Sequence, residues 1–253
     1  MARLISGLQP VREAIRTRGR ELERVLVNES DSPQLKALAR YARDQGARVE
    51  GTSKADLDRL ARGARHQGAI AFAPDLRLRT LDELELGPSA LVVALDELQD
   101  PQNFGAVLRS SVAMGASAVV WPEHSSAPLS PATFRASAGA VEHAILCRVA
   151  GLPEALDALQ RRGLAVLGLD AHAKVPIDEV DLTVPLALVI GAEGKGLRRS
   201  VKAACGALVR LPLHGPVASL NASVAAAIAL YETTRQRAQR DRSKREESGE
   251  DAG

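Results

Sequence analysis

Short apolar runs alternate with amphipathic segments along the first 73 residues. In the amphipathic segments, apolar residues recur at the three-to-four-residue spacing of a helix, with Gly19 and Gly46 at the ends of two of them. The runs between them are rich in Val, Ala and Ile and read as strands. The pattern predicts helices within 5–19, 32–46 and 53–63 and strands at 24–28, 47–52 and 68–73. This alternation indicates a small α/β domain, residues 1–73.

A second pattern begins after residues 74–88, which mix Pro, Gly and charged residues without a strong period and read as a linker or covering segment. Almost wholly apolar runs then alternate with helical segments. The runs occupy 90–98, 116–121, 144–150, 164–170, 186–192 and 207–213, and the helical segments 103–115, 152–163 and 197–205. Buried strands of this kind predict a parallel sheet covered on both faces, in a domain spanning 89–240.

The C-terminal segment changes character along its length. Residues 219–240 form a long helical pattern whose first half is strongly apolar and is expected to be buried. Residues 241–253 are charged and lack apolar residues that could anchor them, which predicts a disordered tail. The basic residues between 235 and 245 suit a solvated helix end better than an RNA contact, but both interpretations stay open.

The composition limits the classes of partner. Hydrophobic residues make up 45% of the chain and aromatic residues only 2%, so the cores must be aliphatic. The same scarcity disfavours binding of single-stranded nucleic acid by aromatic stacking. The net charge is only +2, but residues 1–73 carry 14 basic and 9 acidic residues. That local excess suits a polyanion such as RNA, although a solvated surface gives the same count.

Cysteines and histidines give no sign of a metal site. Cys147 and Cys205 lie far apart in apolar stretches, and none of the five histidines shows ligand spacing. The N-terminal segment has no secretory apolar core, and no apolar run reaches the ~18 residues of a membrane span. We therefore expect a cytoplasmic protein without a metal or a membrane partner.

The stretch "LVIGAEGKGLRRS", residues 188–200, resembles a phosphate-binding loop at first sight. It lacks the Walker A spacing, because Gly194 and Lys195 are followed by Gly196, and it does not fit the G-x-G-x-x-G fingerprint either. Glycines at the carboxyl end of a parallel strand let a ligand approach the backbone closely. A tight turn without a ligand is the alternative.

Two other stretches carry polar residues at comparable places. In "DPQNFGAVLRSSVAMG", Asn103 suits a helix N-cap, and Arg109 follows six residues later on the same short helix. In "LPLHGPVASLNASVA", Ser219, Asn221 and Ser223 lie at the start of an otherwise apolar helix. A single serine would cap the helix, whereas three polar residues suggest that the helix start also contacts a ligand.

Taken together, "NFGAVLRS", "LVIGAEGKGL" and "VRLPLHGPVASLNASVA" resemble, in order, the three signature motifs of the SpoU/TrmH family of RNA ribose 2′-O-methyltransferases. "ISGLQPVREAIR" and "HQGAIAF" resemble the substrate-binding domain of its ribosomal members. The resemblance implies a trefoil-knotted α/β methyltransferase domain with a parallel sheet, preceded by a small L30-like α/β domain. It also implies a homodimer and S-adenosylmethionine (SAM) as methyl donor.

The resemblance also assigns roles to individual residues. It implies that Arg109 activates the ribose hydroxyl; because arginine is too basic to act as a free base, we expect it to stabilise the developing alkoxide and the adjacent phosphate. The other residues implied for catalysis are Asn103, Glu193, Ser219 and Asn221. Those implied to hold SAM are Ile190, Gly191, Ala192, Gly196, Leu211 and Leu220. His214 and Pro216 depart from many family members, which leaves the RNA contacts of that loop open.

The function expected from this resemblance is methyl transfer from SAM to a ribose 2′-hydroxyl of RNA, on a guanosine of 23S ribosomal RNA. The N-terminal domain favours ribosomal RNA, because transfer-RNA members of the family usually lack one. A transfer-RNA 2′-O-methyltransferase and a non-catalytic RNA-binding ribosome-assembly factor are the alternatives.

Overall fold

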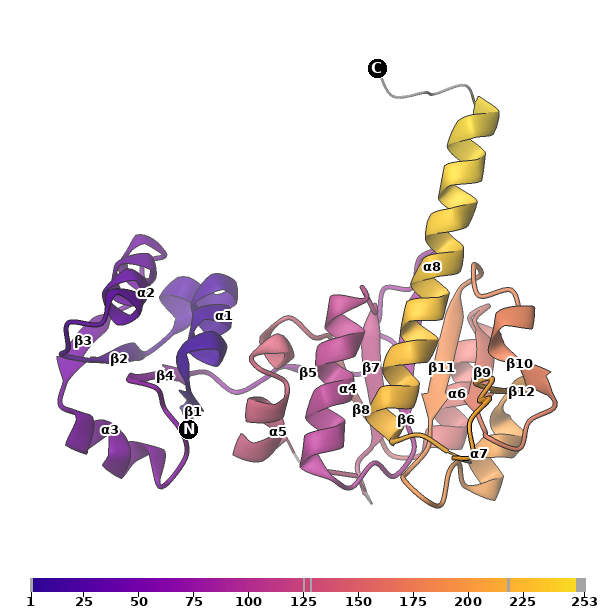
Figure 1. Cartoon of the computed structure of the whole chain (residues 1–253), viewed down its shortest axis with the longest axis horizontal. Coiled ribbons are helices and arrows are strands. Elements are labelled where there is room, and N and C mark those ends of the chain that lie inside the picture. The colour runs from indigo at the N-terminus through magenta and orange to yellow at the C-terminus, as the bar shows by residue number, and fades with distance from the viewer. Residues whose placement is uncertain (1, 125, 128, 218, 249–253) are drawn as a thin grey trace.

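Two α/β domains, joined by an extended segment, make up the computed structural model of this chain (Figure 1). The structure describes residues 2–124, 126–127, 129–217 and 219–248. The two domains lie side by side, and the last helix projects beyond the second domain (Figure 1).

The N-terminal domain is a four-stranded sheet with the order β1-β4-β2-β3, in which only β2 and β3 pair in parallel. Its strands are β1 (Arg3–Ser6), β2 (Arg24–Asn28), β3 (Val49–Thr52) and β4 (Ala69–Ala73). Its helices are α1 (Leu8–Arg18), η1 (Gly19–Glu21), α2 (Pro33–Asp44) and α3 (Lys54–Ala61). The three predicted helices and three predicted strands are all present. The sequence pattern missed β1, whose four residues are too few to show a period.

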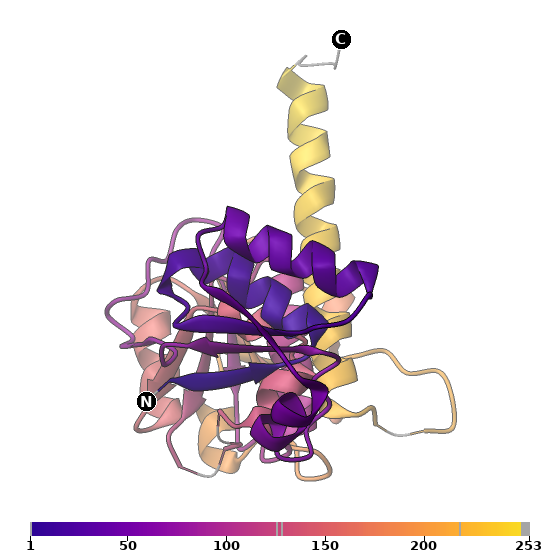
Figure 2. The ribbon, with the colours of Figure 1, turned by 90° about the vertical axis from the view of Figure 1, so that its left-hand side faces the viewer.

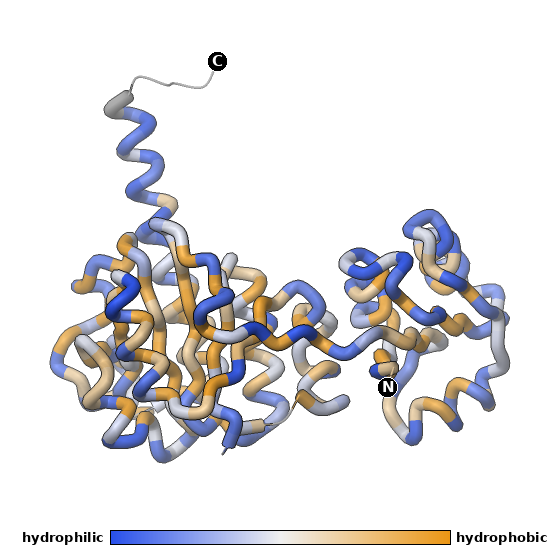
Figure 3. Tube along the Cα trace, turned by 180° about the vertical axis from the view of Figure 1, so that it is seen from behind, coloured by the Kyte–Doolittle hydropathy of each residue, from blue (hydrophilic) through white to orange (hydrophobic). Residues whose placement is uncertain are grey.

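The second domain contains the predicted parallel sheet. Its eight strands have the order β10-β12-β9-β11-β6-β7-β8-β5, and every pairing is parallel. The strands are β5 (Leu78–Arg79), β6 (Leu91–Leu95), β7 (Ala118–Pro122), β8 (Leu146–Val149), β9 (Ala165–Leu169), β10 (Val175–Pro176), β11 (Leu186–Ile190) and β12 (Ala207–Arg210). The central strands are buried on both faces, as a sheet covered by helices requires. The tube in Figure 3 is accordingly most hydrophobic along these strands.

Helices cover both faces of this sheet. One core contains side chains of α4 (Pro101–Ala113), α5 (Pro131–Ala136) and α8 (Ala222–Ser248). The other contains side chains of α6 (Leu152–Arg161) and α7 (Arg199–Ala204). Two short 3-10 helices, η2 (Ala140–Glu142) and η3 (Ile177–Glu179), complete the domain. The pattern did not predict α5, which has fewer than two turns.

The segment 74–88 does more than link the domains. Its residues Leu78 and Arg79 form β5 and extend the large sheet by pairing with β8. The Arg162 guanidinium on α6 donates hydrogen bonds to the carbonyls of Leu81 and Leu84, at 2.7 and 2.5 Å. Leu84 is buried in the core beneath α6. The segment was expected to be either a linker or a covering segment. These contacts show that it covers part of the second domain.

Two expectations for the last helix were wrong. The first half of α8 is only buried on one side: Val224, Ile228 and Tyr231 are 46%, 42% and 58% exposed. These residues follow one another at i, i+4 and i+7, so they form a single apolar stripe that faces away from the core. Residues 241–248, expected to be disordered, continue the helix, and five of these eight residues are Arg, Lys or Glu, which are good helix formers. The rest of the predicted tail lies outside the described residues.

A buried carboxylate joins the two domains. Glu142, on η2, receives hydrogen bonds from Nη2 of Arg3 at 2.8 Å and from Nε of Arg18 at 2.7 Å. The Glu142 side chain is 1% exposed, and Arg3 and Arg18 come from β1 and α1 of the other domain. His143 and Glu13 add a second contact at 2.8 Å. A buried charge is costly unless it is paired, so the relative position of the domains is strongly specified at this point.

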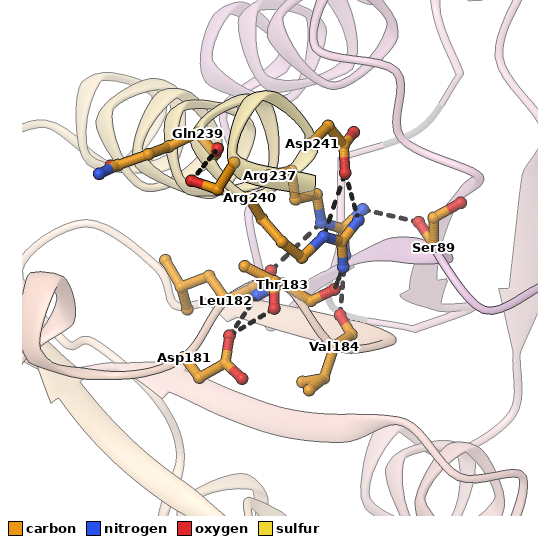
Figure 4. Close-up of polar contacts among 10 residues, drawn as sticks. Ser89, Asp181, Leu182, Thr183, Val184, Arg237, Gln239, Arg240 and Asp241 are labelled. Carbon is orange, nitrogen blue, oxygen red and sulfur yellow. Dashed lines mark hydrogen bonds and ion pairs between the residues drawn. The ribbon is translucent and has the colours of Figure 1, made fainter. Parts of the chain in front are cut away.

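A partly buried cation fixes the start of the central strands. The Arg237 guanidinium on α8 donates to the carbonyls of Ser89, Ala90, Leu182 and Val184, at distances of 2.6 to 3.2 Å (Figure 4). Burial lowers the pKa of Arg237 below its usual value. These carbonyls precede β6 and β11, so Arg237 supplies donors that the strand ends themselves lack.

Replacing Arg237 by alanine should lower the free energy of unfolding by about 3 kcal/mol, because several carbonyls lose a charged donor. Urea denaturation followed by circular dichroism measures this change. Arg235→Ala is the matched control, since exposed Arg235 pairs with Glu232 and Gln239 on its own helix. It should leave the unfolding midpoint nearly unchanged; equal effects of the two substitutions would contradict the role given to Arg237.

Candidate functional site

The glycine-rich segment after β11 is a tight hairpin-like loop. The amide of Gly196 donates to the Ala192 carbonyl at 2.9 Å, and the Ala192 amide donates back at 3.2 Å. Gly194 and Gly196 have φ angles of 72° and 64°, which favour glycine. A Cβ on Gly191 would lie 2.3 Å from the carbonyl carbon of Gly196. Each glycine therefore has a steric reason in the turn itself.

A buried ion pair holds this loop against the end of β6. The fully buried Asp96 accepts hydrogen bonds from the Arg198 backbone amide at 2.8 Å and from its Nε at 2.7 Å. The Asp96 amide in turn donates to the carbonyl of Ile190 at 2.8 Å. Because Asp96 fixes both ends of the segment 190–198, the loop keeps one position at the carboxyl edge of the sheet.

A cavity of about 310 Å³ opens beside this loop. Its size is at the lower end of the range typical of small-molecule sites. Eight of the residues singled out in the sequence line it: Ile190, Gly191, Ala192, Glu193, Gly196, Leu211, Ser219 and Leu220. The segment between β12 and α8, which supplies the last three, extends away from the body of the domain (Figure 2). The lining combines an apolar wall with carboxylate and ammonium groups.

Asn103 and Asn221 meet beside the cavity although 118 residues separate them in the chain. Nδ2 of Asn221 donates to Oδ1 of Asn103 at 3.0 Å and also to the carboxylate of Glu193. Oδ1 of Asn221 accepts from the amide of Ser223 at 2.9 Å and so caps α8. The three motifs of the sequence are thus joined by one amide side chain.

The expected capping role of Asn103 was wrong. Asp100 is the N-cap of α4 and accepts a hydrogen bond from the amide of Gln102. Asn103 lies inside the first turn and is 7% exposed. Its side chain is therefore free to cross to α8.

Arg109 lies apart from this group. It is exposed, does not line the cavity, and forms no hydrogen bond or ion pair with the described part of the chain. Its neighbours Val107 and Leu108 are fully buried, so Arg109 faces outward on α4. His214 and Pro216 are also exposed and lie outside the lining.

The cavity includes charged residues that the sequence analysis missed. Asp170 follows β9, and its carboxylate forms an ion pair with Lys202 of α7. Burial raises the pKa of Asp170, but the hydrogen bond and charge of Lys202 and the amide of His172 outweigh it and lower the pKa overall. "LGLD" has the same form as "VALD" at Asp96: an apolar strand that ends in aspartate at the ligand-binding edge of the sheet.

The cysteines and histidines offer no competing site. Burial raises the pKa of the Cys147 and Cys205 thiols to about 11, so both are neutral at pH 7. Within the described ranges, no three His, Cys, Asp or Glu side chains come together as a metal site. None of the described helices is long and apolar enough to cross a membrane.

Comparison with known proteins places this geometry in context. The model of the SpoU rRNA methylase family matches residues 90–231, and that of the RNA 2′-O ribose methyltransferase substrate-binding domain matches residues 4–78. A putative TrmH family tRNA/rRNA methyltransferase of Bacillus subtilis (strain 168) is 38% identical over 81% of this chain and 84% of its own length.

Solved structures agree with these matches. The SpoU methyltransferase AviRb from Streptomyces viridochromogenes, in complex with the cofactor AdoMet, has a TM-score of 0.78 at 26% identity. The match covers 94% of this chain and 91% of that one. A structure described as an RNA 2′-O ribose methyltransferase has a TM-score of 0.77 at 34% identity, covering 94% and 89%.

Asp96→Asn should lower the free energy of unfolding by about 2 kcal/mol, because Arg198 loses its buried ionic acceptor. It should also speed hydrogen exchange of the amides between 191 and 198. Glu97→Gln is the control: Glu97 contacts the same guanidinium, at 3.4 Å, but is more exposed, and its loss should cost about 1 kcal/mol or less. Unchanged exchange in Asp96→Asn would show that the pair does not hold the loop.

Proposed function

The chain belongs to the SpoU/TrmH family of RNA 2′-O ribose methyltransferases, and on that premise we propose that it methylates a guanosine 2′-hydroxyl of 23S ribosomal RNA. The single observation that supports a working active site is the meeting of Asn103, Glu193 and Asn221 beside the cavity. A protein that kept only the fold would not need to keep this arrangement, which argues against the non-catalytic alternative.

The cavity suits SAM, which supplies an activated methyl group on a sulfonium when bound. Leu211 and Leu220 offer apolar surface for its adenine ring. Gly191 keeps the loop in the position that forms this wall of the cavity, because the backbone of Gly196 leaves no room there for a side chain. Ile190, Ala192, Gly196 and Ser219 complete the proposed contacts, and no metal is required.

The residues around the cavity would align the ribose and assist loss of its proton. Glu193 and Asn103 are held by Asn221, so their oxygen atoms are positioned before the substrate arrives. The guanidinium of Arg109 would stabilise the developing alkoxide and the neighbouring phosphate. Its exposed position and lack of a partner in the described chain leave it available for this contact.

A homodimer formed through α8 would bring Arg109 close to the dimer interface. The apolar stripe Val224, Ile228 and Tyr231 on α8 has no covering element among the described residues. α4, which carries Arg109, packs against α8 in the same core. Two copies that bury this stripe against each other would therefore place each Arg109 close to the interface. We include this dimer, the trefoil knot and a cytoplasmic location in the proposal.

The N-terminal domain supports ribosomal over transfer RNA. A neighbour described as concerned with 2-OH methylation of tRNA matches over 99% of its own length but only 60% of this chain, whereas this chain also has a substrate-binding domain at residues 4–78. A transfer-RNA 2′-O-methyltransferase of the same family is the second candidate, since the relative from Bacillus subtilis is named for both substrates.

Incubation with labelled SAM should transfer methyl groups to ribosomal RNA that lacks its modifications, and mapping of the product should identify a 2′-O-methylguanosine. Arg109→Ala should lower kcat by about a hundredfold with SAM binding unchanged, because only the transition state needs its charge. Transfer to tRNA alone would favour the second candidate. Full turnover by Arg109→Ala would remove the role proposed for it.

Gly191→Ala should weaken SAM binding tenfold or more, because the added methyl would push the loop out of place at a cost of about 1–3 kcal/mol. Isothermal titration calorimetry measures the affinity. Gly215→Ala is the control, since a Cβ there has no neighbour within 4 Å and the residue does not line the cavity. If both variants bind SAM as the unchanged protein does, SAM occupies another place.

A further inference from the structure

A cleft of about 1100 Å³ lies between the two domains, next to their contact at Arg3. Glu142 and His143 join the second domain to β1 and α1. α3 and the residues after it line the cleft on one side, and α5 lines it on the other. The cleft is therefore the space between two domains that Glu142 holds together through Arg3 and Arg18. The relative position fixed by this buried ion pair sets the width of the cleft.

Arginines outnumber carboxylates in the described lining of the cleft. Its described lining contains four arginines and a single carboxylate, that of Asp75. Arg3 is committed to Glu142 and to the face of the Phe134 ring, at 4.9 Å. Arg59 pairs with Asp56 on its own helix. Arg62 and Arg135 are exposed and form no hydrogen bond or ion pair with the described residues.

The two free guanidinium groups come from opposite walls. Arg62 follows α3 in the N-terminal domain, in a left-handed conformation with a φ of 47°. Arg135 lies on α5 of the second domain, next to Phe134. A ligand that contacts both must lie in the cleft, and it must carry negative charge at more than one point along its length.

We propose that this cleft holds the phosphate backbone of the RNA substrate, with Arg62 and Arg135 as its phosphate ligands. The inference rests on the proposed function and adds a path for the RNA. Figure 1 shows α3 and α5 toward the same lower side of the molecule as the loop before α8. Residues of that loop and of the start of α8 line the proposed SAM cavity. A strand held in the cleft can thus continue along this side to the cavity. Guanidinium groups suit the task because they bind phosphate oxygens in a bidentate manner.

The test compares two double variants with the same loss of charge. Arg62→Ala with Arg135→Ala removes both cleft guanidiniums, whereas Arg43→Ala with Arg161→Ala removes one exposed arginine from each domain outside the cleft. The probe is a labelled oligouridylate, whose binding is measured by fluorescence anisotropy across a series of salt concentrations. For single strands, the slope of log K against log salt falls by about 0.7 for each phosphate that the protein no longer neutralises.

We expect the cleft variant to lose about 1.4 from this slope and to bind several-fold more weakly at low salt. Its KM for ribosomal RNA should rise while kcat and SAM affinity stay unchanged, and the control pair should match the unchanged protein. Equal weakening in both pairs, or none in the cleft pair, overturns the inference and leaves the proposed function intact. Failure of the unchanged protein to methylate RNA overturns the proposed function itself.

Discussion

The site depends on the hydrogen bonds that the buried carboxylate of Asp96 accepts from Arg198. Asp96 lies at the end of β6, has no exposed surface, and binds both the backbone and the side chain of Arg198. Its own amide contacts the end of β11, so neighbouring strand ends and the loop between 190 and 198 become one rigid unit. The cavity wall formed by this loop is thereby set before any ligand arrives, as a site that works by alignment requires.

Two further charged groups, partly buried Arg237 and buried Glu142, connect other parts of the chain in the same way. Arg237 satisfies carbonyls that precede β6 and β11, at the opposite ends of the strands from Asp96. Glu142 fixes the N-terminal domain against the second domain. In each case a charge removed from water is stable only with its partners in place, so the pairing specifies one arrangement of segments that are distant in sequence.

The structure differs from the sequence-based predictions mainly in loops and at the edges of the domains. Predicted strands of the second domain all formed, because a run such as "LVVAL" has no favourable place except inside a covered sheet. Asn103 was misplaced because several polar residues near a helix start compete to cap it, and Asp100 does so. The first half of α8 was expected to be buried, whereas one apolar stripe remains exposed in the single chain. Asp170 was overlooked because a single aspartate after a strand carries little information until a lysine lies opposite it.

The sequence by itself determined the two-domain α/β order, the parallel sheet and the three polar motifs, because periodicity, turn residues and motif spacing are local properties of the chain. The tertiary structure alone decided that Asn103, Glu193 and Asn221 share one hydrogen-bonded group while Arg109 stays outside it. It alone decided that the domains meet at Glu142 and leave a cleft between them. Such contacts join residues that are far apart in the chain. They depend on the order of the strands and the direction of the helices, and neither produces a periodic pattern in the sequence.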